Sequence, residues 1–293
     1  METTGSLSRR AAVKSSIFGL LTVSLPGIIY AREIIYTHEI SEQSAGNTEQ
    51  PKVFRRYPSI DDEIVAEVVG SSHFDLDRVK ELVEHRPELA RATWDWAFGD
   101  WETALGAASH VGRRDIAEYL ISKGARPDIF TFAMLGSYEA VKAMIDSKPG
   151  IQTTAGPHGI SLLQHAKAGL RSNDLSVIQK DGCKKLIGYL EDLGDANLRE
   201  KHIKMSAEEK ERYLGDYKYG EGETDGFSVK LNMRDLLSLG KLGKFGGALY
   251  QKAPNLFTYN GILSVEISFE MVDGKVLSLT IYEPDLTLKA VKI

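Results

Sequence analysis

The spacing of apolar residues changes from a period of 3.6 to a period of 2 near residue 200, which divides the chain into two unlike parts. Before this point apolar residues recur at helical spacing, as in Val79, Leu82 and Val83. After it they alternate with polar residues, as expected for strands with one buried face. The 293 residues therefore predict an α+β multidomain protein, in which a helical array precedes a small antiparallel β-barrel.

Residues 213–293 carry the strand pattern. Leu263–Met271 alternates without a fault, and the Asp273-Gly274 pair that follows is a favoured two-residue hairpin turn. One-sided strands in up-and-down order favour a closed or half-closed barrel, whose interior the apolar face of Leu263–Met271 would fill. Further strands are expected at Tyr213–Tyr219, Phe227–Leu231, Asn255–Tyr259, Leu277–Ile281 and Leu286–Ile293, with a flexible loop at Gly240–Gly247.

A short motif in this part resembles a known domain. Tyr213-Leu214-Gly215-Asp216-Tyr217, followed by Phe-x-x-x-Asp-Gly-Lys-Val over Phe269–Val276, is similar to the lipocalin-like domain appended to β-lactamase-related hydrolases. The resemblance implies a lipocalin-like barrel. It does not imply the hydrolase, because no Ser-x-x-Lys motif lies in a suitable setting.

Residues 60–197 contain short amphipathic helices separated by Gly and Pro. The clearest unit, Thr103–Ala125, opens with Thr-x-Leu-x-x-Ala-Ala, has glycines at both helix ends, and resembles an ankyrin repeat. The resemblance implies stacked helical hairpins, each burying one face on its neighbour. Weaker units are expected at Ile60–Ala90, Phe130–Lys148 and Ile160–Leu193, the last with its second helix delayed to Lys184–Leu193 by an insertion at Arg171–Asp181. Residues 198–212 are charged and are expected to form a helical connector.

The N-terminal residues have the pattern of an export signal. Arg9 and Arg10 precede an apolar stretch, Ile17–Ala31, that is short for a membrane span and contains Pro26. The paired arginines resemble a bacterial twin-arginine signal, which implies a periplasmic or secreted protein that meets the membrane only in transit. Residues 1–31 are the predicted signal peptide and 32–59 a polar linker; the alternative is an uncleaved N-terminal anchor.

Composition excludes several classes of protein. The net charge of −5 provides no basic excess to hold a phosphate backbone, so nucleic acid is not an expected partner. The only cysteine, Cys183, excludes a disulfide within the chain and argues against Cys-ligated metal sites. Glycine-rich phosphate loops, the His-Glu-x-x-His motif and the Gly-x-Ser-x-Gly motif are all missing from the sequence. No catalytic residue is therefore predicted, and the protein is not expected to be an enzyme.

The segment Trp94–Glu102 holds all three tryptophans of the chain with three carboxylates among them. If Thr103–Ala125 is aligned as an ankyrin repeat, this segment is the hairpin loop, or finger, that precedes the repeat. Its composition is that of a binding hot spot. The alternative is that Trp94 and Trp101 only fill the gap between the capping unit and the next repeat. The binding candidates in this finger are Trp94, Asp95, Trp96, Asp100, Trp101 and Glu102.

Three histidines join these candidates. In the ankyrin alignment, His110 lies on the inner helix and faces the concave surface, and His165 takes a similar place two units later. His158 lies in the second finger, ahead of the unit that opens at Ile160. Because the intervening unit lacks a finger, the two fingers are expected to approach each other across the groove. Carboxylates with imidazoles would suit a metal or acid–base site. Histidines on repeat surfaces are more often structural, so neither a metal nor a cofactor is predicted.

These features favour an exported, non-catalytic interaction protein that binds a protein or peptide partner through the groove and its tryptophan-rich finger. The alternative is a small-molecule or glycan binder that uses the barrel or the finger. A third hypothesis is an undescribed hydrolase or a regulatory fragment of one, which His110 within hydrogen-bond reach of Asp100 or Glu102 would favour.

Overall fold

The computed structural model describes residues 54–197 and 203–293. The predicted signal peptide, with Arg9 and Arg10, lies outside the described residues, as do most of the linker and the start of the 198–212 connector. The residues from Val53 to Ile293 form one unit. Within the described residues, no helix has both the length and the apolar character needed to cross a bilayer.

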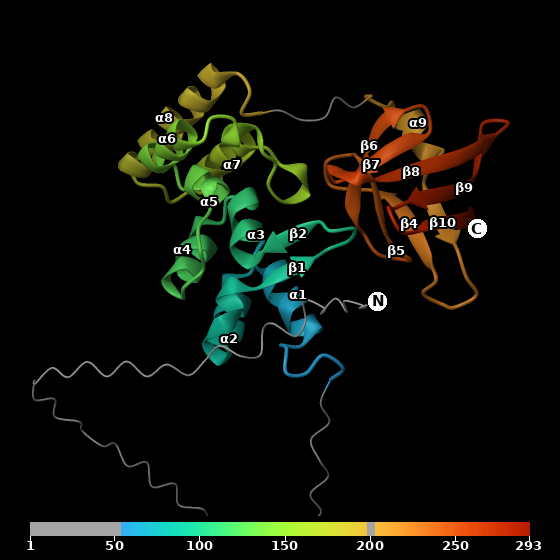
Figure 1. The fold of residues 1–293 in the computed structure, drawn as a ribbon, viewed down its shortest axis with the longest axis horizontal. Coiled ribbons are helices and arrows are strands. Elements are labelled where there is room, and N and C mark those ends of the chain that lie inside the picture. Colours follow the sequence, from blue (N-terminus) through green and yellow to red (C-terminus); the bar gives the residue numbers. More distant parts are fainter. Residues whose placement is uncertain (1–53, 198–202) are drawn as a thin grey trace, which may run out of the picture. The chain divides into compact units, whose positions relative to one another are not determined.

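The N-terminal half is built from pairs of short helices (Figure 1). The first helices of successive pairs pack against one another, α1 on α3, α3 on α5 and α5 on α7. The helices are α1 (Asp62–Ser71), α2 (Leu76–His85), α3 (Ala104–Val111), α4 (Arg114–Ser122), α5 (Ile129–Met134), α6 (Tyr138–Ser147), α7 (Leu162–Ala168) and α8 (Val177–Leu193). Short 3₁₀ turns lie at Pro87–Arg91, Ile151–Thr153, Pro157–Gly159 and Gly169–Arg171.

Helix α3 shows why the sequence folds locally in this way. The Thr103 side chain accepts a hydrogen bond from the Gly106 amide, which satisfies one of the free donors of the first turn. Gly112 ends the helix in the left-handed conformation, with φ of 84°. Ala107 and Ala108 are fully buried, and their small side chains let neighbouring helices approach closely.

Two helical boundaries differ from the expectation. Helix α8 begins at Val177 and not at Lys184, because Ser176 and Gln179 form a reciprocal capping box that starts it earlier. Its first turn is exposed at Val177 and Ile178, so no buried apolar face marks it in the sequence. Within residues 203–212 of the connector, the helix is only α9 (Ala207–Glu211).

The C-terminal half is a closed, eight-stranded antiparallel barrel in the order β10-β3-β4-β5-β6-β7-β8-β9, which confirms the predicted barrel (Figure 1). Its up-and-down architecture is that of lipocalin-like folds. The strands are β3 (Gly215–Lys218), β4 (Gly226–Leu231), β5 (Leu237–Lys241), β6 (Gly247–Ala253), β7 (Leu256–Tyr259), β8 (Ile262–Val272), β9 (Lys275–Tyr282) and β10 (Thr287–Lys292).

The expected alternation along β8 holds in its middle and fails at its ends. Val265, Ile267 and Phe269 are buried, whereas Leu263 is 75% exposed and Met271 only half-buried. The pairing register shifts between Thr258 and Tyr259 of β7 and again between Glu270 and Met271, which reorients the ends of the strand. The Asp273-Gly274 turn is confirmed, with φ of 48° and 77° at its two residues.

Side chains fill the barrel interior. Tyr217, Phe257 and Ile267 are completely buried, and the Tyr213 ring packs edge-on against Phe257 and Phe269. This interior therefore does not favour the hypothesis of a ligand inside the barrel. The expected Gly240–Gly247 loop was wrong at both ends, because β5 continues to Lys241 and β6 begins at Gly247.

Gly169 marks a close approach between α5 and α7. A Cβ atom at this position would lie 2.0 Å from the Met134 carbonyl oxygen, so Gly169→Ala should lower the free energy of unfolding by about 2–3 kcal/mol. Gly188→Ala is the matched control, because a Cβ atom within α8 at Gly188 meets nothing within 4 Å and should be neutral or stabilising by about 0.5–1 kcal/mol. Urea unfolding followed by circular dichroism measures both, and equal effects would contradict this account of the packing.

Candidate metal centre

The finger predicted at Trp94–Glu102 is a two-stranded hairpin that places two carboxylates on one side. Strand β1 (Thr93–Asp95) pairs antiparallel with β2 (Trp101–Thr103), and Trp94 lies opposite Glu102. Because successive side chains of a strand point to opposite faces, Trp101 is 62% exposed while Glu102 is 1% exposed. Asp100, which precedes β2, is also buried, at 3%. The hairpin therefore directs both carboxylates inward.

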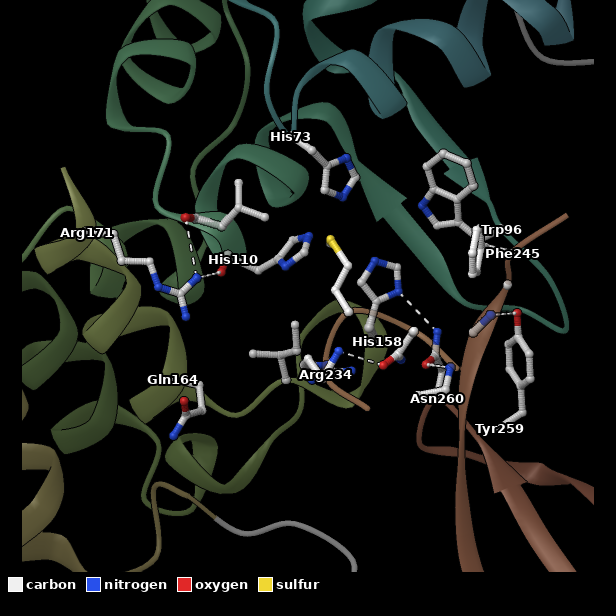
Figure 2. A pocket seen from close by; sticks show the side chains of 17 residues that line it. His73, Trp96, His110, His158, Gln164, Arg171, Arg234, Phe245, Tyr259 and Asn260 are labelled. Carbon is white, nitrogen blue, oxygen red and sulfur yellow. Dashed lines mark hydrogen bonds between the residues drawn. The ribbon is translucent and has the colours of Figure 1, made fainter. Parts of the chain in front are cut away.

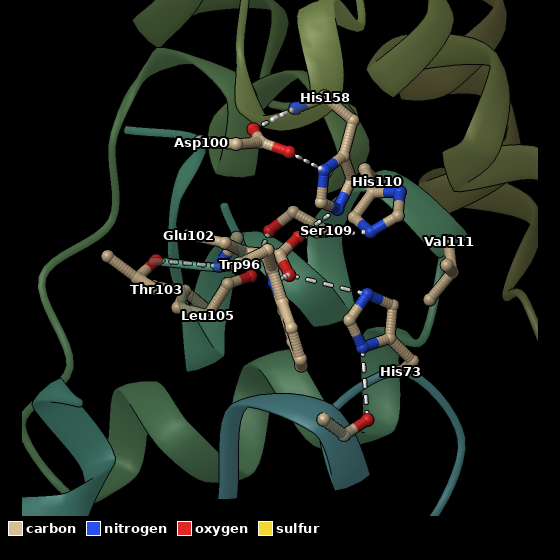
Figure 3. Close-up of polar contacts among 12 residues, drawn as sticks. His73, Trp96, Asp100, Glu102, Thr103, Leu105, Ser109, His110, Val111 and His158 are labelled. Atoms are coloured by element: carbon tan, nitrogen blue, oxygen red, sulfur yellow. Dashed lines mark hydrogen bonds and ion pairs between the residues drawn. The ribbon is translucent and has the colours of Figure 1, made fainter. Parts of the chain in front are cut away.

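Three histidines from separate segments surround Glu102 (Figure 3). His73 follows α1, His110 lies in the last turn of α3, and His158 lies in the 3₁₀ turn Pro157–Gly159 with φ of 58°. The expected approach of the two fingers is observed, since His158 belongs to the second finger and contacts Asp100 of the first. In Figure 3 the three imidazoles and the Glu102 carboxylate point toward one another.

The distances within this group, hereafter the His₃Glu cluster, are short. Nε2 of His110 and Nε2 of His158 lie 3.1 and 3.3 Å from Oε1 of Glu102. Nε2 of His73 lies 3.4 Å from Oε2 of the same carboxylate. One ligand atom from each of the four residues can be chosen so that all lie within 4.8 Å of one another.

Although these atoms lie close together, two of them have no hydrogen-bond partner. Oε1 of Glu102 and Nε2 of His110 are both buried and form no hydrogen bond within the described structure. A buried carboxylate oxygen without a hydrogen bond is costly unless a cation compensates it. Oε1 of Glu102 and Nε2 of His110 therefore lie in a group of close ligand atoms without being hydrogen-bonded to each other.

Outer contacts orient three of the four residues of the cluster: Glu102, His73 and His158. The indole Nε1 of Trp96 donates to Oε2 of Glu102 at 2.7 Å, which leaves Oε1 as the free oxygen. Nδ1 of His73 donates to the Gly70 carbonyl at 3.0 Å, and Nδ1 of His158 donates to Asp100 at 2.7 Å. Both bonds place the ring proton on Nδ1 and leave Nε2 as the atom that faces the centre. Such outer-sphere support is typical of histidines that bind metals.

Asp100 is itself held by three donors. Its carboxylate accepts from the His158 amide at 3.0 Å, from His158 Nδ1 at 2.7 Å and from Nδ2 of Asn260 at 2.7 Å. Asn260 belongs to the β7–β8 turn, so the barrel also supports the cluster.

The electrostatics of the His₃Glu cluster follow from burial and proximity. Burial alone would raise the pKa of Glu102, but His110 and His158 hold it far below its usual range. Burial lowers the pKa of His110. Burial would also lower the pKa of His158, yet Asp100 and Glu102 outweigh it and raise this pKa to about 9. At neutral pH, without a metal ion, Glu102 is therefore ionised and the His158 ring is protonated. A metal ion that binds Nε2 of His158 would have to displace that proton.

The cluster opens into a pocket of about 830 Å³ (Figure 2). The histidine rings form part of its wall, with side chains exposed by 11% to 23%, while Glu102 lies completely buried beneath them. The wall also includes residues of the barrel, among them Arg234, Phe245 and Asn260. A group bound to the cluster would thus be accessible to a small molecule.

Of the predicted binding residues, the structure brings five together: Trp96, Asp100, Glu102, His110 and His158. Trp94 packs against the helical core, and Asp95 accepts a hydrogen bond from the Gly99 amide. Trp101 faces a second pocket of about 490 Å³, which Trp94 also lines. His165 is fully buried apart from the cluster, where Nδ1 donates to the Ser161 carbonyl at 2.9 Å.

Two residues of the site were not predicted. His73 follows α1, in the segment that was expected to be a degenerate capping unit, and Asn260 comes from the barrel. His73 does carry a signal, because a Ser-His pair closes the first helix of two successive hairpins, at Ser72-His73 and at Ser109-His110. Oγ of Ser72 and of Ser109 each donates to the carbonyl four residues back, at 2.7 and 2.6 Å.

Comparison with models of known protein families gave no match, and no curated protein is significantly similar to the chain.

His165 allows a pH test of its structural role. Burial lowers its pKa to about 4, from 6.5, so this ring is neutral in the folded protein while it gains a proton in the unfolded chain below about pH 6.5. Its contribution to stability is therefore lost as the pH falls from about 6.5 to about 4, by about 3 kcal/mol in total. Urea unfolding at pH 7 and pH 4.5 should show a smaller loss for His165→Gln than for wild type. An equal loss in both proteins would contradict this prediction.

Proposed function

We propose that this protein binds a divalent first-row transition metal ion of the zinc type through Nε2 of His73, His110 and His158 and Oε1 of Glu102. The observation that carries the proposal is the buried, unsatisfied Oε1 of Glu102 surrounded by imidazole nitrogens. The 3.1 Å between His110 and Glu102 is also the proximity that would favour the hydrolase hypothesis, although these two atoms form no hydrogen bond.

The separations support a metal of this type. Zinc binds imidazole nitrogen and carboxylate oxygen at about 2.0–2.2 Å, which places neighbouring ligand atoms of a tetrahedron about 3.4 Å apart. The contacts of 3.1 and 3.3 Å to Oε1 of Glu102 are close to this value. Three nitrogen donors favour zinc, copper, iron or nickel over magnesium and calcium, which prefer oxygen ligands.

Two residues of the chain orient the proposed ligands of such an ion. Trp96 holds Glu102 in a monodentate position, and Asp100 fixes the tautomer and orientation of His158. A bound zinc-type ion supplies a Lewis acid at the wall of the pocket. The proposal therefore replaces the expected non-catalytic groove with a metal-dependent site for a small molecule.

The direct test is metal uptake by the purified protein. After treatment with a chelator, wild type should bind one Zn²⁺ per chain in calorimetry, and Co²⁺ should give a visible spectrum typical of nitrogen and oxygen ligands. His110→Ala removes a ligand and should lower the Zn²⁺ affinity by more than about 100-fold. Asp100→Asn keeps all ligands and should lower it by about 10–100-fold, as supporting residues do.

The matched control is His85→Ala, because His85 is exposed at the end of α2 and lies outside the His₃Glu cluster. This variant should bind Zn²⁺ like wild type. Circular dichroism of the metal-free proteins verifies that each variant is folded. If wild type and His110→Ala bind Zn²⁺ equally, the cluster is a polar network only and the proposal fails.

We also propose that the helical half is an ankyrin-like array and that the chain is exported through Arg9 and Arg10. The pairing of helices and the stacking of their first members support the array. The export proposal rests on the sequence alone.

A second candidate function is the binding of a protein or peptide partner at the outer face of the hairpin. The observation that favours it is the 62% exposure of Trp101 beside a pocket that Trp94 also lines.

Trp101→Ala tests this second function without touching the metal ligands. Once a partner has been purified, its affinity should fall at least tenfold, as for truncation of a tryptophan hot spot. Phe74→Ala is the matched control, because Phe74 is 69% exposed and lies outside the hairpin. Titration calorimetry compares the variants, and unchanged affinity in Trp101→Ala would exclude this surface.

A further inference from the structure

The wall of the pocket beside the His₃Glu cluster carries positive but no negative side chains. Its lining includes Arg171 and Arg234, and none of the lining residues is aspartate or glutamate. Two buried carboxylates lie close to the pocket without lining it. A divalent ion would neutralise Glu102, and Asp100 is hydrogen-bonded to His158 and Asn260. Electrostatics therefore favour an anionic ligand in this pocket.

The two guanidinium groups are weakly engaged. Within the described residues neither forms an ion pair; Nη1 of Arg171 lies 3.4 Å from the His110 carbonyl, and Nη2 of Arg234 lies 3.4 Å from the Tyr250 hydroxyl. Both distances are at the long limit for hydrogen bonds. Arginine presents a planar fork that suits carboxylate and phosphate oxygens. Both groups thus retain capacity for a charged ligand, and Figure 2 shows them at the pocket with the histidines.

The rest of the wall is largely apolar. Val111 and Ile160 come from the helical half, while Met233, Phe245 and Ala248 come from the barrel. Phe245 is 69% exposed, so its ring is available to contact a bound ligand. An apolar wall with a few polar groups, in a volume of about 830 Å³, matches the general features of a site for a small organic molecule.

We infer that the pocket binds a small organic oxyanion, a carboxylate or phosphate monoester with an apolar body. One oxygen of the anion coordinates the metal, Arg171 and Arg234 neutralise its charge, and the body packs on Phe245 and the aliphatic wall. This inference rests on the proposed metal centre, because the coordination of the oxyanion requires the ion.

The experiment uses the full chain loaded with Co²⁺ and four probes. Phenylacetate and phenyl phosphate should change the visible Co²⁺ spectrum in a saturable manner, and comparison of their affinities distinguishes the carboxylate from the phosphate. The uncharged phenylacetamide and the cationic phenethylamine have the same ring without the anion. We expect both to bind at least tenfold more weakly and to leave the spectrum unchanged.

Variants assign the effect to the pocket. Arg171→Gln and Arg234→Gln should each lower the affinity for the better anion by about tenfold, while Co²⁺ affinity stays within twofold of wild type. Arg126→Gln is the matched control, because Arg126 is exposed and lines neither pocket. If phenylacetamide binds as well as phenylacetate, or neither arginine variant weakens anion binding, the inference is overturned. A protein that binds no Co²⁺ would refute the metal centre itself, whereas metal binding without an anion response would refute only the inference.

Discussion

The buried carboxylate of Glu102 is the constraint around which the site is organised. An ionised carboxylate that is 1% exposed is tolerated only with strong compensation. Trp96 satisfies one oxygen, while the other faces imidazoles without a hydrogen bond. The three histidines surround this carboxylate, and each of them turns its Nε2 atom toward it. These are the atoms that an ion bound at the centre would require.

The fold brings these ligands together through two kinds of structure. The β1–β2 hairpin inserts Glu102 by the simple alternation of a strand, and the stacked first helices place His73 and His110 at equivalent ends of neighbouring hairpins. His158 enters from a separate turn with a left-handed backbone. Because the ligands come from four segments, no short sequence motif records the site.

Local physics made much of the fold predictable from the sequence. The change of hydrophobic period, the helix end at Gly112 and the Asp273-Gly274 turn each act within a few residues, and all three appear in the structure. Strands β5 and β6 were missed because the glycine-rich stretch expected to be a loop overlaps both of them: Gly240 lies in β5 and Gly247 begins β6. The start of α8 was missed because its first turn buries no apolar face.

Only part of the site could be predicted from the sequence, because its remaining contacts join segments that are far apart in the chain. Composition identified the finger, and the ankyrin-like frame identified His110 and His158. The pairing of His73 with Glu102 depends on helix stacking, which no local pattern encodes. The contact of Asn260 with Asp100 spans the two halves of the chain. Since Asp100 orients His158, any movement of the β7–β8 turn changes the support of a proposed metal ligand. The barrel, whose interior is filled, thus contributes to the centre from its outer turns, and the two halves form one site although their sequence patterns are unrelated.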